Sequence, residues 1–298
     1  MKLKILTEAS GSLVSGYLIK AIKECGYIAV ASDIDEFNHA KCLADEFIVF
    51  PDKNDNFLWN KIEKLLKDNK IDIVIPSFDE TLLGWAERKR YFKNENIEII
   101  ISDINTLETF LDKWKAYEFC LKNDILTPKT SLNNEHSLIK PRFGRGGKDI
   151  YLNDNSINME NMISQEFIEG KEFTVDCFFD YEGNPVYLIP RVRLNVKDGK
   201  STKGIVVKND KIKEIIEKIS ENIKFIGPVN FQFIENDKNE VYFIECNPRI
   251  AGGMALGFAA SENWINLIIK NLIYKEKIIP KEIKYGLRMA RYYDECFF

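Results

Sequence analysis

Two alternating segments near the end of the chain constrain its fold more than any other feature. The first covers residues 227–234, the second covers 241–249, and the polar sequence Asp237-Lys238-Asn239-Glu240 joins them. Alternation of apolar and polar residues on both sides of a short polar turn predicts an antiparallel β-hairpin.

The predicted register brings three oxygen-bearing side chains together. With the turn centred in the middle of the polar sequence, Gln232 lies opposite Glu245 and Asn230 lies opposite Asn247. Because side chains alternate between the faces of a strand, Gln232, Glu245 and Asn247 share one face. Mg²⁺ takes such oxygen ligands, often one or two carboxylates plus substrate phosphates. With Arg249 next along the strand, we interpret the hairpin as a Mg-nucleotide site beside a phosphate-reading arginine; the alternative is a surface hairpin with scattered polar residues.

Length and charge limit the number of domains and the kinds of partner that this chain can have. The 298 residues suffice for two or three domains, and a hydrophobic content of 45% is enough to form buried hydrophobic cores. Acidic and basic residues are mixed, the net charge is −4 and no long basic run occurs, so we expect no nucleic-acid partner. A bound nucleotide therefore has to meet local lysines and arginines.

The six cysteines form no C-x-x-C pair, and two histidines are too few for a usual zinc set. We expect reduced, mostly buried thiols. The chain opens directly on a strand-like segment, without a signal-peptide pattern or an apolar run of ~20 residues. These features predict a soluble cytoplasmic protein without a membrane partner.

The first 105 residues alternate short apolar runs with helical stretches. This order predicts a parallel sheet covered on both faces. The expected strands are Leu3–Leu6, Ile28–Ala31, Phe47–Phe50, Ile71–Ile75 and Ile97–Ile101, and helices are expected over Leu13–Glu24 and Phe57–Asp68.

The turn after the first strand, residues 8–16, resembles a nucleotide-binding turn but lacks G-x-G-x-x-G. A helix N-cap at Ser10 or Ser12 explains it equally well. Asp33 and Asp35 end the second strand, where a dinucleotide fold places its ribose-binding acid. Without the glycine fingerprint, NAD binding is not favoured.

From residue 106 onward the pattern changes to strands with fewer helices. A helix begins near Asp112 and runs to about Asn123, and another covers Asp210–Asn222. A third helix is expected over Phe258–Leu272. The expected strands are Ser137–Pro141, Asp149–Leu152, Met162–Ile168, Glu172–Asp180, Pro185–Arg193 and Leu287–Tyr293.

A glycine-rich loop joins two of these strands. Glycines let backbone N–H groups approach phosphate oxygens, and no Gly-Lys-Ser/Thr opens a helix as in a Walker A loop. We interpret the loop as a lid over a triphosphate; a tight hairpin would also use glycine. Its glycines are Gly144, Gly146 and Gly147, and its basic residues are Lys140, Arg142, Arg145 and Lys148.

Residues 165–174 provide an apolar segment whose free backbone N–H and C=O groups can form hydrogen bonds with the edge of an adenine. Glu172, one strand later, can accept two ribose hydroxyls. The alternative for this glutamate is a solvated surface position. After the hairpin, residues 251–254 either present backbone N–H groups to an acceptor carboxylate or form a plain loop before the next helix.

Together, and in this order, these elements resemble the ATP-grasp superfamily, especially the synthetase units of carbamoyl-phosphate synthase large subunits and biotin carboxylase. The resemblance implies an α/β and α+β chain: an N-terminal pre-ATP-grasp (Rossmann-like) parallel-sheet domain, then a two-lobed ATP-grasp fold. The implied domains are 1–108, an N-lobe with the glycine-rich lid at 109–180, and a C-lobe with the Mg-ATP and acceptor site at 181–298.

The resemblance also implies roles for individual residues. Gln232 stands where many relatives carry glutamate. The implied phosphate-contacting lysines are Lys113 and Lys140, the adenine contacts are the backbones of Glu166 and Ile168, and the ribose contact is Glu172. The implied metal ligands are Gln232, Glu245 and Asn247. Arg249 would bind the γ-phosphate or the acyl-phosphate, and Arg193 and Lys203 stand where relatives carry another phosphate-contacting residue, as does Arg191.

The implied activity is an ADP-forming carboxylate-amine ligase that uses ATP with Mg²⁺ or Mn²⁺ and passes through an acyl-phosphate. One alternative is a carbamoyl-phosphate-synthase-like subunit acting with a partner chain; another is a non-catalytic ATP-binding module. The expected partners are a small carboxylate and an amine, and a homodimer is one expected assembly. Acceptor specificity is expected in the first domain and in the loops around 79–80 and 201–203.

Overall fold

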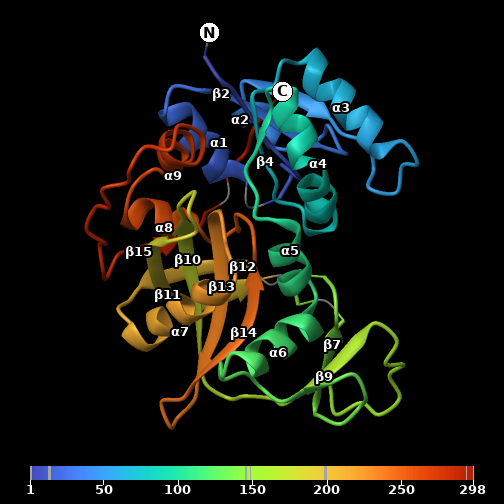
Figure 1. Ribbon diagram of the computed structural model, residues 1–298, viewed down its shortest axis with the longest axis vertical. Helices are drawn as coiled ribbons and strands as arrows, with labels where there is room; N and C mark the ends of the chain where they lie inside the picture. Colours follow the sequence, from blue (N-terminus) through green and yellow to red (C-terminus); the bar gives the residue numbers. More distant parts are fainter. Residues whose placement is uncertain are drawn as a thin grey trace.

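A computed structural model describes residues 2–12, 15–144, 146–147, 149–197, 200–292 and 294–297. Its first unit is a parallel five-stranded sheet in the order β3-β2-β1-β4-β5, at the top of Figure 1. The predicted parallel sheet is thus confirmed. Its strands are β1 (Lys4–Thr7), β2 (Ile28–Asp33), β3 (Glu46–Val49), β4 (Ile73–Ile75) and β5 (Glu98–Ile99).

The helices of this unit alternate with the strands, as the apolar periodicity predicts. They are α1 (Ser15–Glu24), α2 (Ala40–Leu43), α3 (Leu58–Asp68) and α4 (Leu82–Asn94), with a 3₁₀ turn η1 (Asp79–Thr81) before α4. Both strands at 71–75 and 97–101 are shorter than predicted, although their outer residues Ile71, Ile97 and Ile101 are still buried. The apolar pattern is longer than the strands because it marks buried residues, including those that form no strand pairing.

Two helices connect the first unit to the rest, α5 (Ile104–Leu111) and α6 (Lys113–Lys122). Asp112 is the N-cap of α6, and its side chain accepts hydrogen bonds from the backbone of Trp114 and Lys115. An antiparallel four-stranded sheet follows, in the order β6-β9-β7-β8. It comprises β6 (Thr130–Ser131), β7 (Leu138–Pro141), β8 (Tyr151–Leu152) and β9 (Met162–Gln165).

The third sheet has six strands in the order β14-β13-β10-β11-β12-β15 and lies between the other two (Figure 1). Helix α7 (Asp210–Asn222) belongs to this part of the chain. The strands are β10 (Lys171–Phe179), β11 (Pro185–Lys197), β12 (Lys200–Val206), β13 (Gly227–Glu235), β14 (Val241–Asn247) and β15 (Arg288–Ala290).

The predicted boundary at residue 180 falls between β10 and β11, which pair with each other in this six-stranded sheet. Strand β10 also pairs with β13 along its whole length. We therefore propose that the predicted N-lobe, which begins at residue 109, ends near Gly170. The first boundary, at 108, falls inside α5.

Alternate residues of the six-stranded sheet face two separate cores. Val175 and Cys177 of β10 join a cluster with Ile212 and Ile216 of α7. Phe178, which points the other way, joins a cluster that also contains residues of α1 and of the C-terminal helices. This two-sided burial fixes the register, because a shift by one residue would exchange the two faces.

The single helix predicted over 258–272 is wrong. The structure has α8 (Ala255–Ala260), α9 (Trp264–Leu267) and a π-helical segment η2 (Ile268–Ile273). Ser261 has φ −125° and ψ −90°, which ends α8, and the Asn263 side chain accepts from the Ile265 N–H to start α9. The apolar pattern continues through this break because both helices pack on the same core.

Candidate nucleotide site

The hairpin adopts the predicted register. Asn230 pairs with Asn247 and Gln232 with Glu245, and a bulge follows between Gln232 and Phe233. The side chains of Gln232 and Asn247 both donate to Oε1 of Glu245, the latter over 3.1 Å. The three predicted metal ligands therefore converge on one face.

In this arrangement the amide oxygens turn toward two arginines. Gln232 Oε1 accepts from Nη1 of Arg193 over 3.3 Å, and Asn247 Oδ1 accepts from Nη2 of Arg249 over 3.0 Å. Rotation of either amide by 180° exchanges its nitrogen and oxygen, which would direct an oxygen ligand toward the side of Glu245. Among the described residues, no cluster of three or more His, Cys, Asp or Glu side chains could hold a metal. One carboxylate and two amides fit a cation that takes its remaining ligands from phosphates.

A cavity of about 780 Å³ separates the four-stranded sheet from the six-stranded sheet. Its walls contain most of the predicted nucleotide-binding residues. These are Lys113, Lys140, Gly144, Gly146, Gly147, Glu166, Ile168, Glu172, Arg193, Gln232 and Glu245. Residues of both sheets thus enclose one volume that is large enough for a nucleotide.

Lys140 is the third residue of β7 and is buried, with Nζ donating to Oε1 of Gln165 over 2.8 Å. Burial lowers the pKa of Lys140 to about 8, and nearby Glu245 partly opposes that shift. Lys113 opens α6 on the other side, and burial lowers its pKa as well. A phosphate between these two cations would restore the charged form of each.

The glycine-rich loop passes over the same cavity. Gly144, Gly146 and Gly147 have φ of 105°, 78° and 66°, a left-handed conformation that side chains rarely adopt. Lys113 Nζ donates to the carbonyl of Gly144 over 3.0 Å, so the loop lies against the start of α6. Arg145 and Lys148 lie outside the described residues.

Arg142 does not add its charge to the phosphate region. Its guanidinium is paired with both oxygens of Asp112, the N-cap of α6, over 2.7 and 2.6 Å. Of the four basic residues that mark this loop in the sequence, this one therefore ties β7 to α6. The pairing was not visible in the sequence because the partners are 30 positions apart.

The predicted adenine and ribose contacts line the same cavity. The Glu166 N–H donates to the carbonyl of Lys129 over 2.8 Å, so the carbonyl of Glu166 is the group it can offer to an adenine. Glu172 is exposed on β10, and its Oε2 accepts from Arg193 over 3.4 Å. Burial lowers the pKa of Arg193.

Four residues with an implied role are not among the residues that line this cavity: Arg191, Lys203, Asn247 and Arg249. Arg191 is instead buried on β11 in an ion pair with Asp176. Lys203 is exposed on β12, where its backbone pairs with Ala290. Asn247 contacts Glu245, and Arg249 lies two residues beyond β14, after Pro248, where it contacts Asp79 of the first unit. From the sequence alone, Asp79 is expected only in a loop that affects acceptor specificity.

Two family models match separate parts of the chain. Residues 9–100 match a PylC-like N-terminal domain, and residues 158–295 match an ATP-grasp family described as acting in the biosynthetic pathway with Ter operon. No curated protein sequence is detectably similar.

Solved structures resemble the chain over nearly its whole length. Biotin carboxylase from Campylobacter jejuni has a TM-score of 0.75 at 16% identity, over 96% of this chain and 74% of that one. The N5-carboxyaminoimidazole synthetase of Staphylococcus aureus has a TM-score of 0.74 at 16% identity, over 96% and 81%. The biotin carboxylase domain of Hydrogenobacter thermophilus 2-oxoglutarate carboxylase has a TM-score of 0.74 at 17% identity, over 97% of this chain and 74% of that one. Residues 158–295 thus match an ATP-grasp family, and nearly the whole chain shares the fold of these solved structures.

Proposed function

We propose that this protein is an ATP-dependent carboxylate-amine ligase that forms an acyl-phosphate and releases ADP and phosphate. The observation that carries the proposal is the convergence of Lys113, Lys140, Arg193 and Glu245 on one cavity under a glycine-rich loop. Lysines and arginine there match the charge of a triphosphate, and Glu245 matches its divalent cation.

The similar structures support a nucleotide as the ligand. The Campylobacter jejuni structure is a complex of biotin carboxylase with a β,γ-ATP compound. The Hydrogenobacter thermophilus structure contains MgADP and bicarbonate. We carry the nucleotide and the cation over to this chain because its own cavity holds the matching charges.

The proposed reaction makes use of this charge arrangement. Lys113 and Lys140 would hold the α- and β-phosphates, and Gln232, Glu245 and Asn247 would hold Mg²⁺. Bound there, the cation would neutralise the charge that develops on the terminal phosphates. A substrate carboxylate oxygen attacks the γ-phosphorus, and the bond from that phosphorus to the ADP oxygen breaks. The amine then attacks the acyl carbon, phosphate leaves, and the amine loses a proton.

No side-chain nucleophile is needed for this sequence of steps, since the substrate carboxylate is the nucleophile. The protein contributes positioning and fixed positive charge. Arg249, next to Asn247, is the residue we expect at the γ-phosphate or the acyl-phosphate.

The test is a screen of carboxylate and amine pairs for ATP-dependent phosphate release by the purified chain. Nucleotide products are then resolved by chromatography. We expect ADP as the product. Arg249→Ala should lower turnover at least 100-fold, a loss of roughly 3 kcal/mol of transition-state stabilisation. It should change ADP affinity less than threefold, which is less than about 1 kcal/mol. Arg90→Ala, at an exposed position of α4, is the matched control. AMP as the main product would overturn the proposed mechanism.

A further inference from the structure

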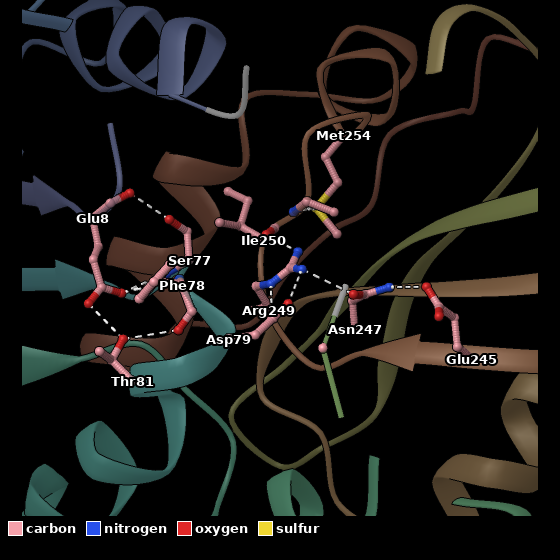
Figure 2. Close-up of polar contacts among 12 residues, drawn as sticks. Glu8, Ser77, Phe78, Asp79, Thr81, Glu245, Asn247, Arg249, Ile250 and Met254 are labelled. Atoms are coloured by element: carbon pink, nitrogen blue, oxygen red, sulfur yellow. Dashed lines mark hydrogen bonds and ion pairs between the residues drawn. The ribbon is translucent and has the colours of Figure 1, made fainter. Parts of the chain in front are cut away.

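The guanidinium of Arg249 is held by a carboxylate from the first unit of the chain. Both its Nε and its Nη2 donate to Asp79, the latter over 2.8 Å, across 170 positions of sequence. The exposed fractions of the two side chains are 9% and 12%. A two-point pairing of this kind fixes the plane of the guanidinium as well as its position (Figure 2).

Most of the remaining donors of Arg249 are also occupied. Its Nη2 donates to Asn247 Oδ1 over 3.0 Å, and its Nη1 donates to the carbonyl of Ile250 over 3.0 Å. A guanidinium has five N–H bonds. Within the described residues, these contacts account for four of them, which leaves one N–H on Nη1 for a ligand.

The segment that carries Asp79 is itself fixed by a buried carboxylate. Oε2 of Glu8, at the end of β1, accepts from the backbone N–H groups of Ser77 and Phe78, each over 3.2 Å. Its Oε1 contacts the hydroxyl of Thr81 over 2.7 Å and the indole nitrogen of Trp85 over 3.1 Å. Figure 2 shows Glu8 on one side of this segment and Arg249 on the other.

We propose that Asp79 is a positioning residue that orients Arg249 for the terminal phosphate of the nucleotide, and that Glu8 holds the segment carrying Asp79 in place. This inference rests on the proposed function, because it takes Arg249 as the residue that reaches the phosphate. The phosphate end of the site is then completed by the first unit.

The physical reason is the flexibility of arginine. A free arginine side chain loses up to about 2 kcal/mol of rotamer entropy when a ligand fixes it. Asp79, Asn247 and Ile250 impose that order before the ligand arrives, so the ligand does not have to supply it. Asp79 could have the opposite role and occupy Arg249 until a ligand displaces it. In that case, removing the charge of Asp79 would increase the preference for a triphosphate.

The experiment compares the affinity of the full chain for Mg²⁺ with AMPPNP, a triphosphate analogue, against its affinity for Mg²⁺ with ADP. Isothermal titration gives the ratio for the wild type, Asp79→Asn, Arg249→Ala and the double variant. We expect Asp79→Asn to lower the triphosphate preference about tenfold with ADP affinity unchanged within twofold. In the Arg249→Ala background, Asp79→Asn should have no further effect, since the two residues act as one unit.

Glu87→Gln is the control, because it also removes a carboxylate from this unit but lies exposed on α4 in an ion pair with Arg88. If Arg249→Ala loses the triphosphate preference while Asp79→Asn keeps or increases it, the inference is wrong. If Arg249→Ala itself keeps the preference, the proposed role of Arg249 fails instead, so the two failures are distinct.

A measurement on the wild type covers the case in which Asp79→Asn does not fold. Hydrogen exchange of the backbone amides at 77–81 should slow more with Mg²⁺ and AMPPNP than with Mg²⁺ and ADP. The reason is that the terminal phosphate adds a contact to Arg249 and so restrains Asp79. Equal exchange in the two complexes would contradict the inference.

Discussion

Arg191 and Asp176 form an ion pair that is sealed inside the six-stranded sheet. Nε of Arg191 donates to Oδ2 of Asp176 over 2.9 Å, and the exposed fractions of the two side chains are 3% and 0%. Nη2 of Arg191 donates to Oδ1 of Asp176 over 3.2 Å, and the Asn230 side chain adds a third contact by donating to the same oxygen over 2.9 Å. Gly253 lies directly over the guanidinium, where an added Cβ would meet Arg191 Nη2 at 2.0 Å.

This pair predicts a large effect on stability when only one partner is removed. Asp176→Ala leaves a buried arginine without its counter-charge and should lower the free energy of unfolding by about 3–5 kcal/mol. The double variant Asp176→Ala, Arg191→Met should be more stable than Asp176→Ala alone. Urea denaturation measures both. Glu108→Gln, which breaks an exposed pair with Lys115, should cost less than about 1 kcal/mol.

The pKa of Lys140 predicts a pH dependence of nucleotide binding. Burial lowers this pKa to about 8, so the ammonium is charged below pH 8 and neutral above it. Phosphate binds the charged form, so the Kd for ADP should stay level below pH 7 and rise through pH 8, by up to about tenfold per pH unit. Lys140→Arg keeps its charge throughout and should give a level profile up to pH 9. Identical profiles for the two proteins, measured by titration calorimetry, would rule out Lys140 as the source.

Glu245 predicts a metal-specific defect. Glu245→Ala removes the one carboxylate of the converging trio and should reduce turnover by about two orders of magnitude, or about 2.7 kcal/mol. Electron paramagnetic resonance of Mn²⁺ in the presence of ADP should show at least a tenfold weaker metal affinity. Glu240→Gln, in the exposed turn of the same hairpin, is the matched control. Unchanged Mn²⁺ affinity would exclude Glu245 as a ligand.

The glycine-rich loop predicts a change of exchange rate on nucleotide binding. The amides of Gly144, Gly146 and Gly147 are exposed at the cavity wall and should exchange more slowly once they contact phosphate oxygens. Hydrogen exchange with and without AMPPNP and Mg²⁺ tests this. The exposed hairpin turn at 236–240 serves as the internal reference and should not change. A lid function is contradicted if the three glycines behave like that reference.

The elements that the sequence predicts well are those whose pattern is local. Alternation in the hairpin determines which residues are opposite each other, and it placed Gln232 against Glu245 correctly. Strand and helix order in the first unit follows from apolar runs that are each only a few residues long. The prediction of a single helix over 258–272 is wrong because the apolar face continues across a break, where Ser261 ends α8 and Asn263 starts α9.

Contacts between distant segments were not predictable in the same way. The pairing of Asp79 with Arg249, or of Asp112 with Arg142, depends on how whole units are placed. A charged residue looks the same in the sequence whether it binds a ligand or a second side chain. For this reason the sequence predicts Arg142 as one of the lid charges, although the structure shows it paired with Asp112.

The shared core under α1 has a consequence for synthesis of the chain. Leu18 and Ile22 of α1 pack in one cluster with Trp264 and Ile265, and Asn263 donates to the carbonyl of Ala21 over 2.9 Å. This face of α1 emerges from the ribosome more than 200 residues before its partners. The first unit therefore carries an uncovered apolar surface until the helices around residue 264 have been synthesised, and it reaches its final packing only then.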